Sequence, residues 1–118
     1  MQAIRGAITV DSNDSKEIAA NTTELFGEIC RINKLEECEL VSLIISLTPD
    51  LTKYNPATAL RDNGMLISTP LFCVQEPFVE GMLPLCIRIL VLTNQKLKEP
   101  VHVYLKKARS LRPDLVGK

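Results

Sequence analysis

The amino-acid sequence predicts a single α/β domain of the α+β type, with a five-stranded mixed sheet and one long helix over one of its faces. The length favours one domain, because a chain of 118 residues can bury one hydrophobic core and little more. Five segments rich in branched aliphatic residues are typical of strands, whereas residues 15–33 repeat their apolar side chains at helical spacing. No repeat, low-complexity stretch or linker divides the sequence, so residues 1–118 are predicted to form one domain.

The first two predicted elements are a strand and the long helix that follows it. Branched and small residues alternate over 4–10, and Asp-Ser-Asn at 11–13 is typical of a turn. A helix is expected over about 15–33, because Asp14 and Glu17 have the spacing of a capping box. One face of this helix is predicted to be apolar and to lie on the sheet. The residues of that face are Ile18, Thr22, Leu25, Phe26, Ile29 and Ile32.

Four more strands and a short helix are predicted in the rest of the chain. The strands are expected over 40–47, 66–75, 85–93 and 101–105, and Pro70 indicates that the second of these is an edge strand or contains a bulge. Asn55 is predicted to cap a short helix that has Pro56 in its first turn and ends near Gly64. The basic segment after residue 105 is expected to be irregular.

The second face of the predicted sheet needs a cover that the long helix does not supply. Segments 40–47 and 85–93 are apolar on both sides, which predicts that this face is buried against another subunit. A closed cyclic trimer is one economical arrangement, and the pattern suits a dimer equally well.

Composition and charge exclude several classes of function. Fourteen basic and fourteen acidic residues give a net charge of zero, so no broad attraction to nucleic acid or to an anionic membrane is expected. The longest apolar run, 82–92, is shorter than the roughly 20 residues of a membrane span and contains Arg88. The first residues lack the pattern of a secretory signal, and a cytoplasmic location is predicted.

The cysteines and the single histidine do not form the pattern of a metal site. No Cys-x-x-Cys pair occurs among the four cysteines, and His102 is the only imidazole, so no bound metal is expected. The cysteines are predicted to be free thiols, as is usual in a reducing cytosol. His102 is expected to have a structural role.

Two arginines stand out because each interrupts an apolar strand. Arg5 lies in the first predicted strand, and Arg88 lies between isoleucines in the fourth. Each could pair with a structural carboxylate or point to solvent, because an unpaired buried guanidinium is costly. With Glu76 at the end of another strand, the two arginines favour a small anion-binding site. Arginine suits such a site because its planar guanidinium donates two parallel hydrogen bonds to a carboxylate.

Six sequence segments, taken in order, carry a resemblance to a known enzyme family. They are IRGAITV at 4–10, TPDL at 48–51, NPATALR at 55–61, CVQE at 73–76, CIRILV at 86–91, and HVYL with LRPDL at 102–115. Together they resemble the monofunctional chorismate mutases that fold as trimeric pseudo-α/β barrels, a family distinct from the all-helical mutases. The resemblance covers nearly the whole chain. It implies a homotrimer with active sites between subunits, which rearranges chorismate to prephenate in aromatic amino-acid biosynthesis without a cofactor.

The resemblance also implies roles for individual residues. Arg88 corresponds to the arginine that contacts the ether oxygen of the breaking bond and a substrate carboxylate, and Glu76 to the acid that holds the ring hydroxyl. Both are therefore expected to be catalytic. Arg5 corresponds to a carboxylate-binding arginine, and Tyr104 to a tyrosine that contacts the same end of the substrate. Leu111 corresponds to a residue that helps to cover the site.

Three further substrate-binding residues follow from the same resemblance. Arg61 corresponds to an arginine that the neighbouring subunit contributes near the second carboxylate, and Ala57 lines the same wall. Cys73 corresponds to a residue packed beside the ring hydroxyl. The chain departs from the best-known family pattern at Asn55 and Thr58, where that pattern has an aromatic residue and a lysine. Both departures fall on the rim from the neighbour and bear on how the cleft closes around a dianion.

Each assignment also has a structural interpretation. Cys73 suits a small apolar core position, and Tyr104 could be a core aromatic with a satisfied hydroxyl. Arg61 could balance the negative end of its short helix. Two other functions stay open: a trimeric deaminase of enamine or imine intermediates, and a non-catalytic trimer that binds a carboxylate metabolite.

Overall fold

A five-stranded mixed sheet forms the centre of the computed structural model, which describes residues 1–66, 68–97 and 99–114. The strand order is β3-β2-β4-β1-β5, and β4 runs antiparallel to both β1 and β2. The pairs β2/β3 and β1/β5 are parallel. The predicted five-stranded mixed sheet is therefore confirmed. The strands are β1 (Gln2–Thr9), β2 (Leu40–Leu47), β3 (Leu71–Gln75), β4 (Cys86–Thr93) and β5 (Val103–Leu105).

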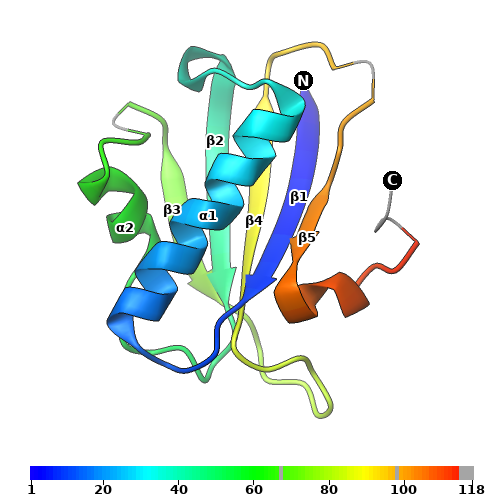
Figure 1. Cartoon of the computed structure of the whole chain (residues 1–118). Coiled ribbons are helices and arrows are strands. Elements are labelled where there is room, and N and C mark those ends of the chain that lie inside the picture. The colour runs from blue at the N-terminus through cyan, green and yellow to red at the C-terminus, as the bar shows by residue number, and fades with distance from the viewer. Residues whose placement is uncertain (67, 98, 115–118) are drawn as a thin grey trace.

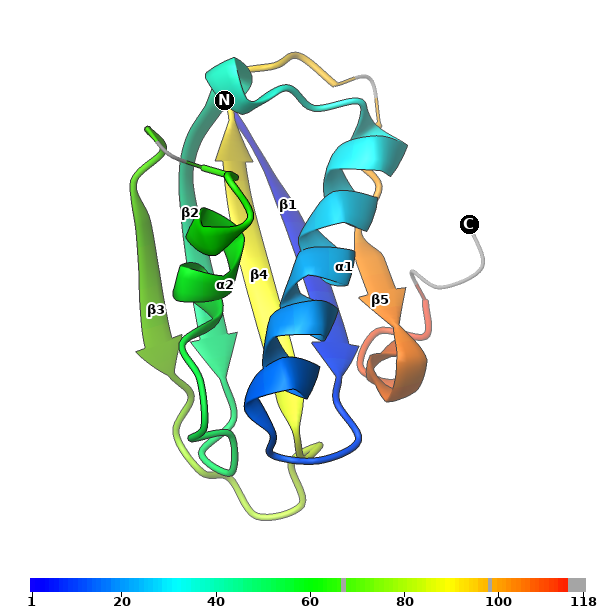
Figure 2. The ribbon, with the colours of Figure 1, turned by 60° about the vertical axis from the view of Figure 1, so that its left-hand side comes forward.

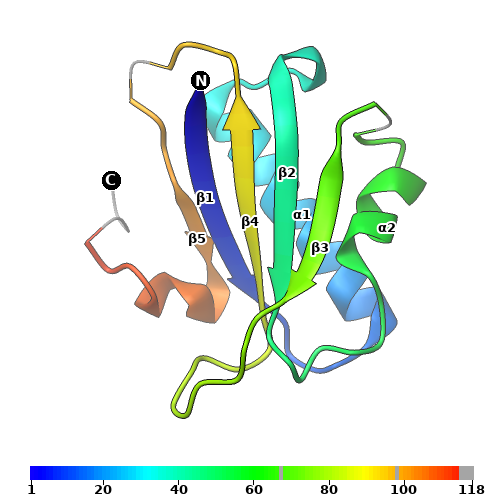
Figure 3. The same ribbon diagram turned by 180° about the vertical axis from the view of Figure 1, so that it is seen from behind.

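Both α-helices lie on the same side of this sheet. Helix α1 (Ser15–Asn33) crosses the middle strands, and α2 (Pro56–Asp62) lies beside β3 (Figures 1 and 2). The opposite side, seen in Figure 3, is called the open face here. The 3-10 helix η2 (Lys106–Ser110) packs near one corner of it, at the ends of β1 and β5, together with Leu83 and Leu111. A second 3-10 helix, η1 (Glu37–Glu39), leads into β2. Neither α-helix is long and apolar enough to cross a membrane.

The long helix begins and ends where its capping residues predict. The Asp14 carboxylate accepts hydrogen bonds from the backbone N–H groups of Lys16 and Glu17 at 3.1 and 3.2 Å, as an N-cap should. The Glu17 carboxylate accepts from Asp11 N at 3.2 Å instead of from the cap residue, so it ties the helix to the preceding turn. The helix ends at Lys34, whose φ of 54° places it in the left-handed region.

The buried face of α1 agrees with the predicted stripe except in its last turn. Ile18, Leu25 and Ile29 are fully buried on the sheet, whereas Ile32 is 37% exposed, so the prediction for Ile32 was wrong. Asn33 takes the inner position instead. Its side chain donates to Val101 O at 2.9 Å and accepts from Val101 N at 2.8 Å, which holds the segment that leads into β5.

The strand predicted over 4–10 spans 2–9 as β1, and three other strand boundaries and the C-terminal segment also differ from the predictions. β3 begins at Leu71 and not at residue 66, because Pro70 has no N–H for the ladder; residue 67 of the predicted strand lies outside the described residues. β4 begins after Leu85, whose φ is 52°, and β5 begins two residues late, at Val103. The segment expected to be irregular forms η2.

Gly6 is required where β1 passes under α1. A Cβ built on Gly6 would lie 2.6 Å from the Ile29 Cδ1 atom and 3.2 Å from the Leu25 Cδ1 atom, both in the packed core. We therefore expect Gly6→Ala to lower the free energy of unfolding by about 1–3 kcal/mol through overpacking. Urea unfolding at one fixed protein concentration would measure this. Ile29→Val removes the clashing methyl group, so the double variant should cost less than the sum of the single variants, and simple additivity would contradict this explanation.

Candidate active site

Four of the predicted site residues line one pocket on the open face. Arg5, Arg88, Tyr104 and Leu111 come from β1, β4, β5 and the C-terminal segment, and they surround a pocket of about 360 Å³. Strand pairing brings these distant parts of the sequence together. The other residues that line it are Gly6, Ala7, Ile44, Ser46, Ile89, Leu90 and Arg112.

Side chains of β4 point alternately to the two faces of the sheet, and this alternation places Arg88 in the pocket. Ile87 and Ile89 are buried toward α1, so the side chain between them points to the open face. The residues paired with Arg88 are Ala7 on β1 and Ser46 on β2. Both are small, which leaves room for the guanidinium between the strands.

Glu76 does not line the pocket itself and contacts it through an ion pair with Arg88. Its carboxylate Oε1 lies 3.3 Å from Arg88 Nε and accepts a hydrogen bond from Ser46 Oγ at 2.6 Å. The backbone N–H of Glu76 donates to Leu47 O at 2.8 Å, which continues the β2/β3 pairing by one residue and orients the acid. The Glu76 side chain is 19% exposed and that of Arg88 is 45% exposed. The guanidinium is thus oriented by Glu76 and remains accessible to a ligand.

Cys86 lies beneath this pair as a packing residue. It is buried with Ala7 and Ala108 in a small apolar cluster on the open face. Burial raises the pKa of the Cys86 thiol, while the Arg88 charge lowers it and the charges of Glu76 and Asp50 raise it. Because burial dominates, the thiol stays protonated at neutral pH and is not a nucleophile.

The C-terminal segment closes one side of the pocket. Lys107 N donates to Thr9 Oγ1 at 3.0 Å, which anchors η2 to the end of β1. Leu111 N then donates to Ala108 O at 3.0 Å, and the chain turns back toward the pocket. Arg112 follows and pairs with Asp114 at 2.9 Å, a contact that raises the Arg112 pKa.

The sequence reasoning missed two polar members of this site. Arg112 is a third guanidinium in the pocket lining, and Ser46 holds the carboxylate of Glu76. The signal for Arg112 was its place directly after Leu111. The signal for Ser46 was a polar residue within an otherwise apolar strand.

Three predicted site residues lie apart from both this pocket and the Arg88–Glu76 pair. Cys73 pairs with Ile45 and belongs to the side of β3 that packs on the core, in a groove with Leu51 and Asn55. Burial raises the pKa of its thiol. Arg61 donates to Thr69 O at 3.5 Å, at the β3 edge of the sheet. Of these three residues only Cys73 lines that groove, while Ala57 and Arg61 belong to α2.

One departure from the family pattern has a structural explanation. The Asn55 side chain accepts a hydrogen bond from Ala57 N at 2.9 Å and so caps α2. Asn55 therefore serves as the N-cap of α2. Ala57, in the first turn of this helix, packs partly against the core. Nothing in the structure explains the residue at Thr58.

The chemistry that the pocket favours is binding of a small anion. Arg5, Arg88 and Arg112 supply positive charge, and Glu76 supplies one opposing carboxylate beside Arg88. Guanidinium groups hold carboxylates through paired hydrogen bonds. Among the described residues no group of three His, Cys, Asp or Glu side chains is placed to hold a metal ion.

Comparison with known proteins assigns the chain to a family. The family model described as chorismate mutase type I matches residues 1–115. Chorismate mutase AroH of Bacillus subtilis (strain 168) is 38% identical over 117 residues, which cover 98% of this chain and 92% of that protein. Chorismate mutase AroH of Thermus thermophilus is 40% identical over 118 residues, with 98% and 96% covered. A solved chorismate mutase structure from Clostridium thermocellum superposes with a TM-score of 0.89 at 40% identity, covering 93% of this chain and 99% of that one. The chain belongs to the chorismate mutase type I family.

Proposed function

We propose that this protein is a chorismate mutase, an isomerase that converts chorismate to prephenate by an intramolecular rearrangement in aromatic amino-acid biosynthesis. The observation that carries this proposal is the Arg88–Glu76 pair, in which Arg88 lines a pocket together with two further arginines. Such a reaction needs no nucleophile, proton transfer or cofactor from the protein. We also place the enzyme in the cytoplasm, where its four unpaired cysteines would stay reduced.

The pocket suits this reaction because it can hold both ends of the substrate. Chorismate carries two carboxylates, a ring hydroxyl and the ether bond that breaks. We assign Arg5 to one carboxylate, with Tyr104 beside it, and Glu76 to the ring hydroxyl. Holding the substrate at these points favours the compact conformation in which the two bonding carbons meet.

Arg88 and Glu76 are assigned to the transition state. As the ether bond breaks, negative charge grows on its oxygen and positive charge grows on the ring. Arg88 would stabilise the oxygen and Glu76 the ring, and their contact at 3.3 Å holds both in place beforehand. Little reorganisation is then needed when charge develops, which is the main source of electrostatic catalysis.

We propose a homotrimer with active sites between subunits as the working form. The open face exposes large apolar side chains on β2 and β3: Ile44 is 39% exposed, Val74 46% and Phe72 76%. Apolar patches of this kind mark protein interfaces. The proposed interface would bring Ala57, Arg61 and Cys73 of one subunit to the Arg88 pocket of the next, which explains why the predicted site is divided in one chain.

Mixing two inactive variants tests this arrangement. Arg88→Ala and Arg61→Ala each remove one side of a shared site, so trimers that contain both variants should regain one site with both arginines. Random reassembly after dilution from denaturant should therefore restore about one quarter of the wild-type rate. Each variant refolded alone is the control. No gain on mixing would contradict the sharing of sites between subunits.

The activity itself is tested with the purified protein and chorismate, without added metal or cofactor. We expect chorismate absorbance to fall and the product to give phenylpyruvate on treatment with acid. Binding of chorismate without turnover would overturn the proposal and indicate a carboxylate-binding protein. Release of ammonia from an imino acid would indicate a deaminase.

A further inference from the structure

We propose that His102 is a positioning residue for Arg5: its unprotonated Nδ1 atom holds the Arg5 backbone and thereby directs the Arg5 guanidinium into the active-site pocket. The inference rests on the proposed function, because it assigns Arg5 to the substrate carboxylate. His102 does not line the pocket itself. It is also the only histidine of the chain, which makes its state directly measurable.

The contact lies at the edge of a short strand pairing. Arg5 N donates to His102 Nδ1 at 2.9 Å. The parallel pairing of β1 with β5 begins one residue later, with Gly6 opposite Val103 and Ala7 opposite Tyr104. The imidazole therefore supplies the acceptor that a strand carbonyl would supply if β5 began earlier.

This single contact affects several parts of the pocket. β5 has three residues and is an edge strand beside β1, so side-chain contacts help to hold it in register: His102 with Arg5, Asn33 with Val101, and Thr9 with Lys107. The same strand carries Tyr104 and leads through η2 to the residues that close the pocket. A small shift between β1 and β5 would move Arg5 and Tyr104 relative to each other, and such misplacement of binding groups lowers reaction rates.

The protonation state of His102 follows from the direction of this hydrogen bond. An imidazole nitrogen that accepts must be unprotonated, so the neutral ring carries its proton on Nε2. Burial lowers the His102 pKa, and so do the positive charges of Arg5 on β1 and Arg112 in the C-terminal segment. The nearest titratable group in the sequence is Tyr104, on β5. A second proton would turn Nδ1 into a donor that faces the Arg5 N–H and would break the contact.

Two substitutions separate the positioning role from a packing role. The side-chain oxygen of asparagine can take the place of Nδ1, whereas that of glutamine reaches the place of Nε2. We expect His102→Asn to retain most of kcat/KM. His102→Gln should raise KM for chorismate about tenfold with a smaller change in kcat, because the contact orients a substrate-binding arginine. Equal kinetics for the two variants would overturn the proposal, provided that both fold, as thermal unfolding would show.

The pH profile is a second readout. Wild-type kcat/KM should fall as pH drops through the lowered pKa of His102, on the acid side of about 6.5, and His102→Asn should stay level over that interval. The unfolded chain binds this proton more readily, so the wild-type fold also loses stability there, and unfolding must be followed at each pH. If kcat/KM of His102→Asn fell at low pH in the same way as that of the wild type, the proposal would be contradicted.

A measurement on the free protein keeps this inference separate from the proposed function. The two ring nitrogens of a single histidine are distinguished by 15N NMR, and we expect an unprotonated Nδ1 and a protonated Nε2 at pH 7.5. The opposite tautomer would overturn the positioning role even if chorismate is turned over. The expected tautomer without turnover of chorismate by the wild type would overturn the proposed function alone.

Discussion

Arg88→Ala should cost the enzyme at least ~3 kcal/mol of transition-state stabilisation, which corresponds to roughly a hundredfold or more in kcat/KM. Arg88 is the one guanidinium that β4 places between two small neighbours, Ala7 and Ser46, and that an acid orients from the side. The alanine variant would leave the ether oxygen without its donor as negative charge develops. Steady-state kinetics with chorismate would measure the loss, and near-normal turnover would rule out this role.

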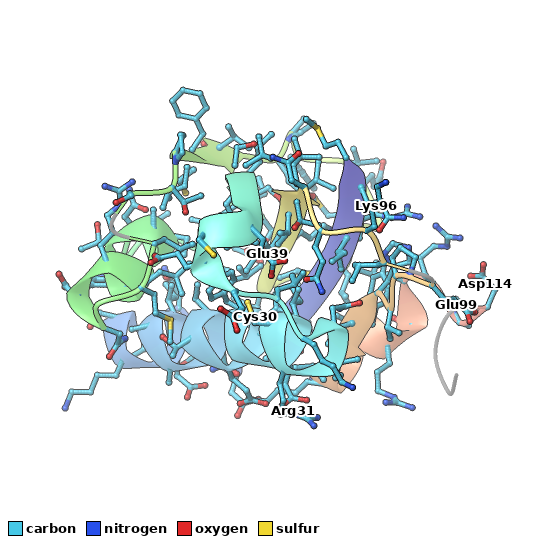
Figure 4. The ribbon with its side chains drawn as sticks, turned by 90° about the horizontal axis from the view of Figure 1, so that it is seen from above. Cys30, Arg31, Glu39, Lys96, Glu99 and Asp114 are labelled. Carbon is cyan, nitrogen blue, oxygen red and sulfur yellow. The ribbon has the colours of Figure 1, made fainter. Side chains whose placement is uncertain are left out.

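Two further variants sharpen the expected result for Arg88. Arg88→Lys should recover little, because an ammonium group cannot contact Glu76 and the substrate oxygen in the geometry of the guanidinium. Arg31→Ala is the matched control. Arg31 also forms an ion pair, with Glu28 at 2.8 Å, but it lies on the outer side of α1, away from the pocket (Figure 4). The control should keep wild-type kinetics, so a loss there would indicate a general effect on folding.

The sequence was sufficient for most of the fold because local signals and burial agree. Asp14 caps α1 where predicted, and the apolar stripe of that helix lies on the sheet. The predictions were wrong where tertiary contacts determine the burial or the secondary structure of a residue. Ile32 is exposed because Asn33 at the inner position satisfies the backbone of Val101, and no helical periodicity can show that contact. The 3-10 helix η2 depends on its anchor at Thr9, a residue distant in the sequence.

The candidate site was predictable only in part, because the positions of several of its residues depend on tertiary contacts. Strand alternation and resemblance together indicated Arg5 and Arg88, which do meet in one pocket. Cys73 lies on the core side of β3, a placement that depends on the register of β3 against β2. His102 was expected to be structural, and only the structure shows that its Nδ1 atom accepts from Arg5. Arg112 joins the site through the path of the chain after η2, which composition alone does not predict.

Glu76→Gln should lower kcat about a hundredfold with a smaller change in KM. Glutamine preserves the size of the side chain and an oxygen that can accept from Ser46 Oγ, so the substitution removes mainly the negative charge. That charge is expected to act on the positive ring of the transition state. Thermal unfolding should change little, because the Arg88–Glu76 pair is partly exposed. An effect confined to KM would contradict a role for the charge in the transition state.

A double variant decides whether Glu76 acts on the substrate or only through Arg88. The contact of 3.3 Å between Arg88 Nε and the Glu76 carboxylate means that either explanation predicts a slow single variant. If Glu76 only orients the guanidinium, Arg88→Ala with Glu76→Gln should be no slower than Arg88→Ala alone. We expect the double variant to be at least about tenfold slower, because the ring then loses its own stabilising charge in addition to the donor at the oxygen. Equal rates would make Glu76 a positioning residue and leave Arg88 as the only catalytic side chain of the pair.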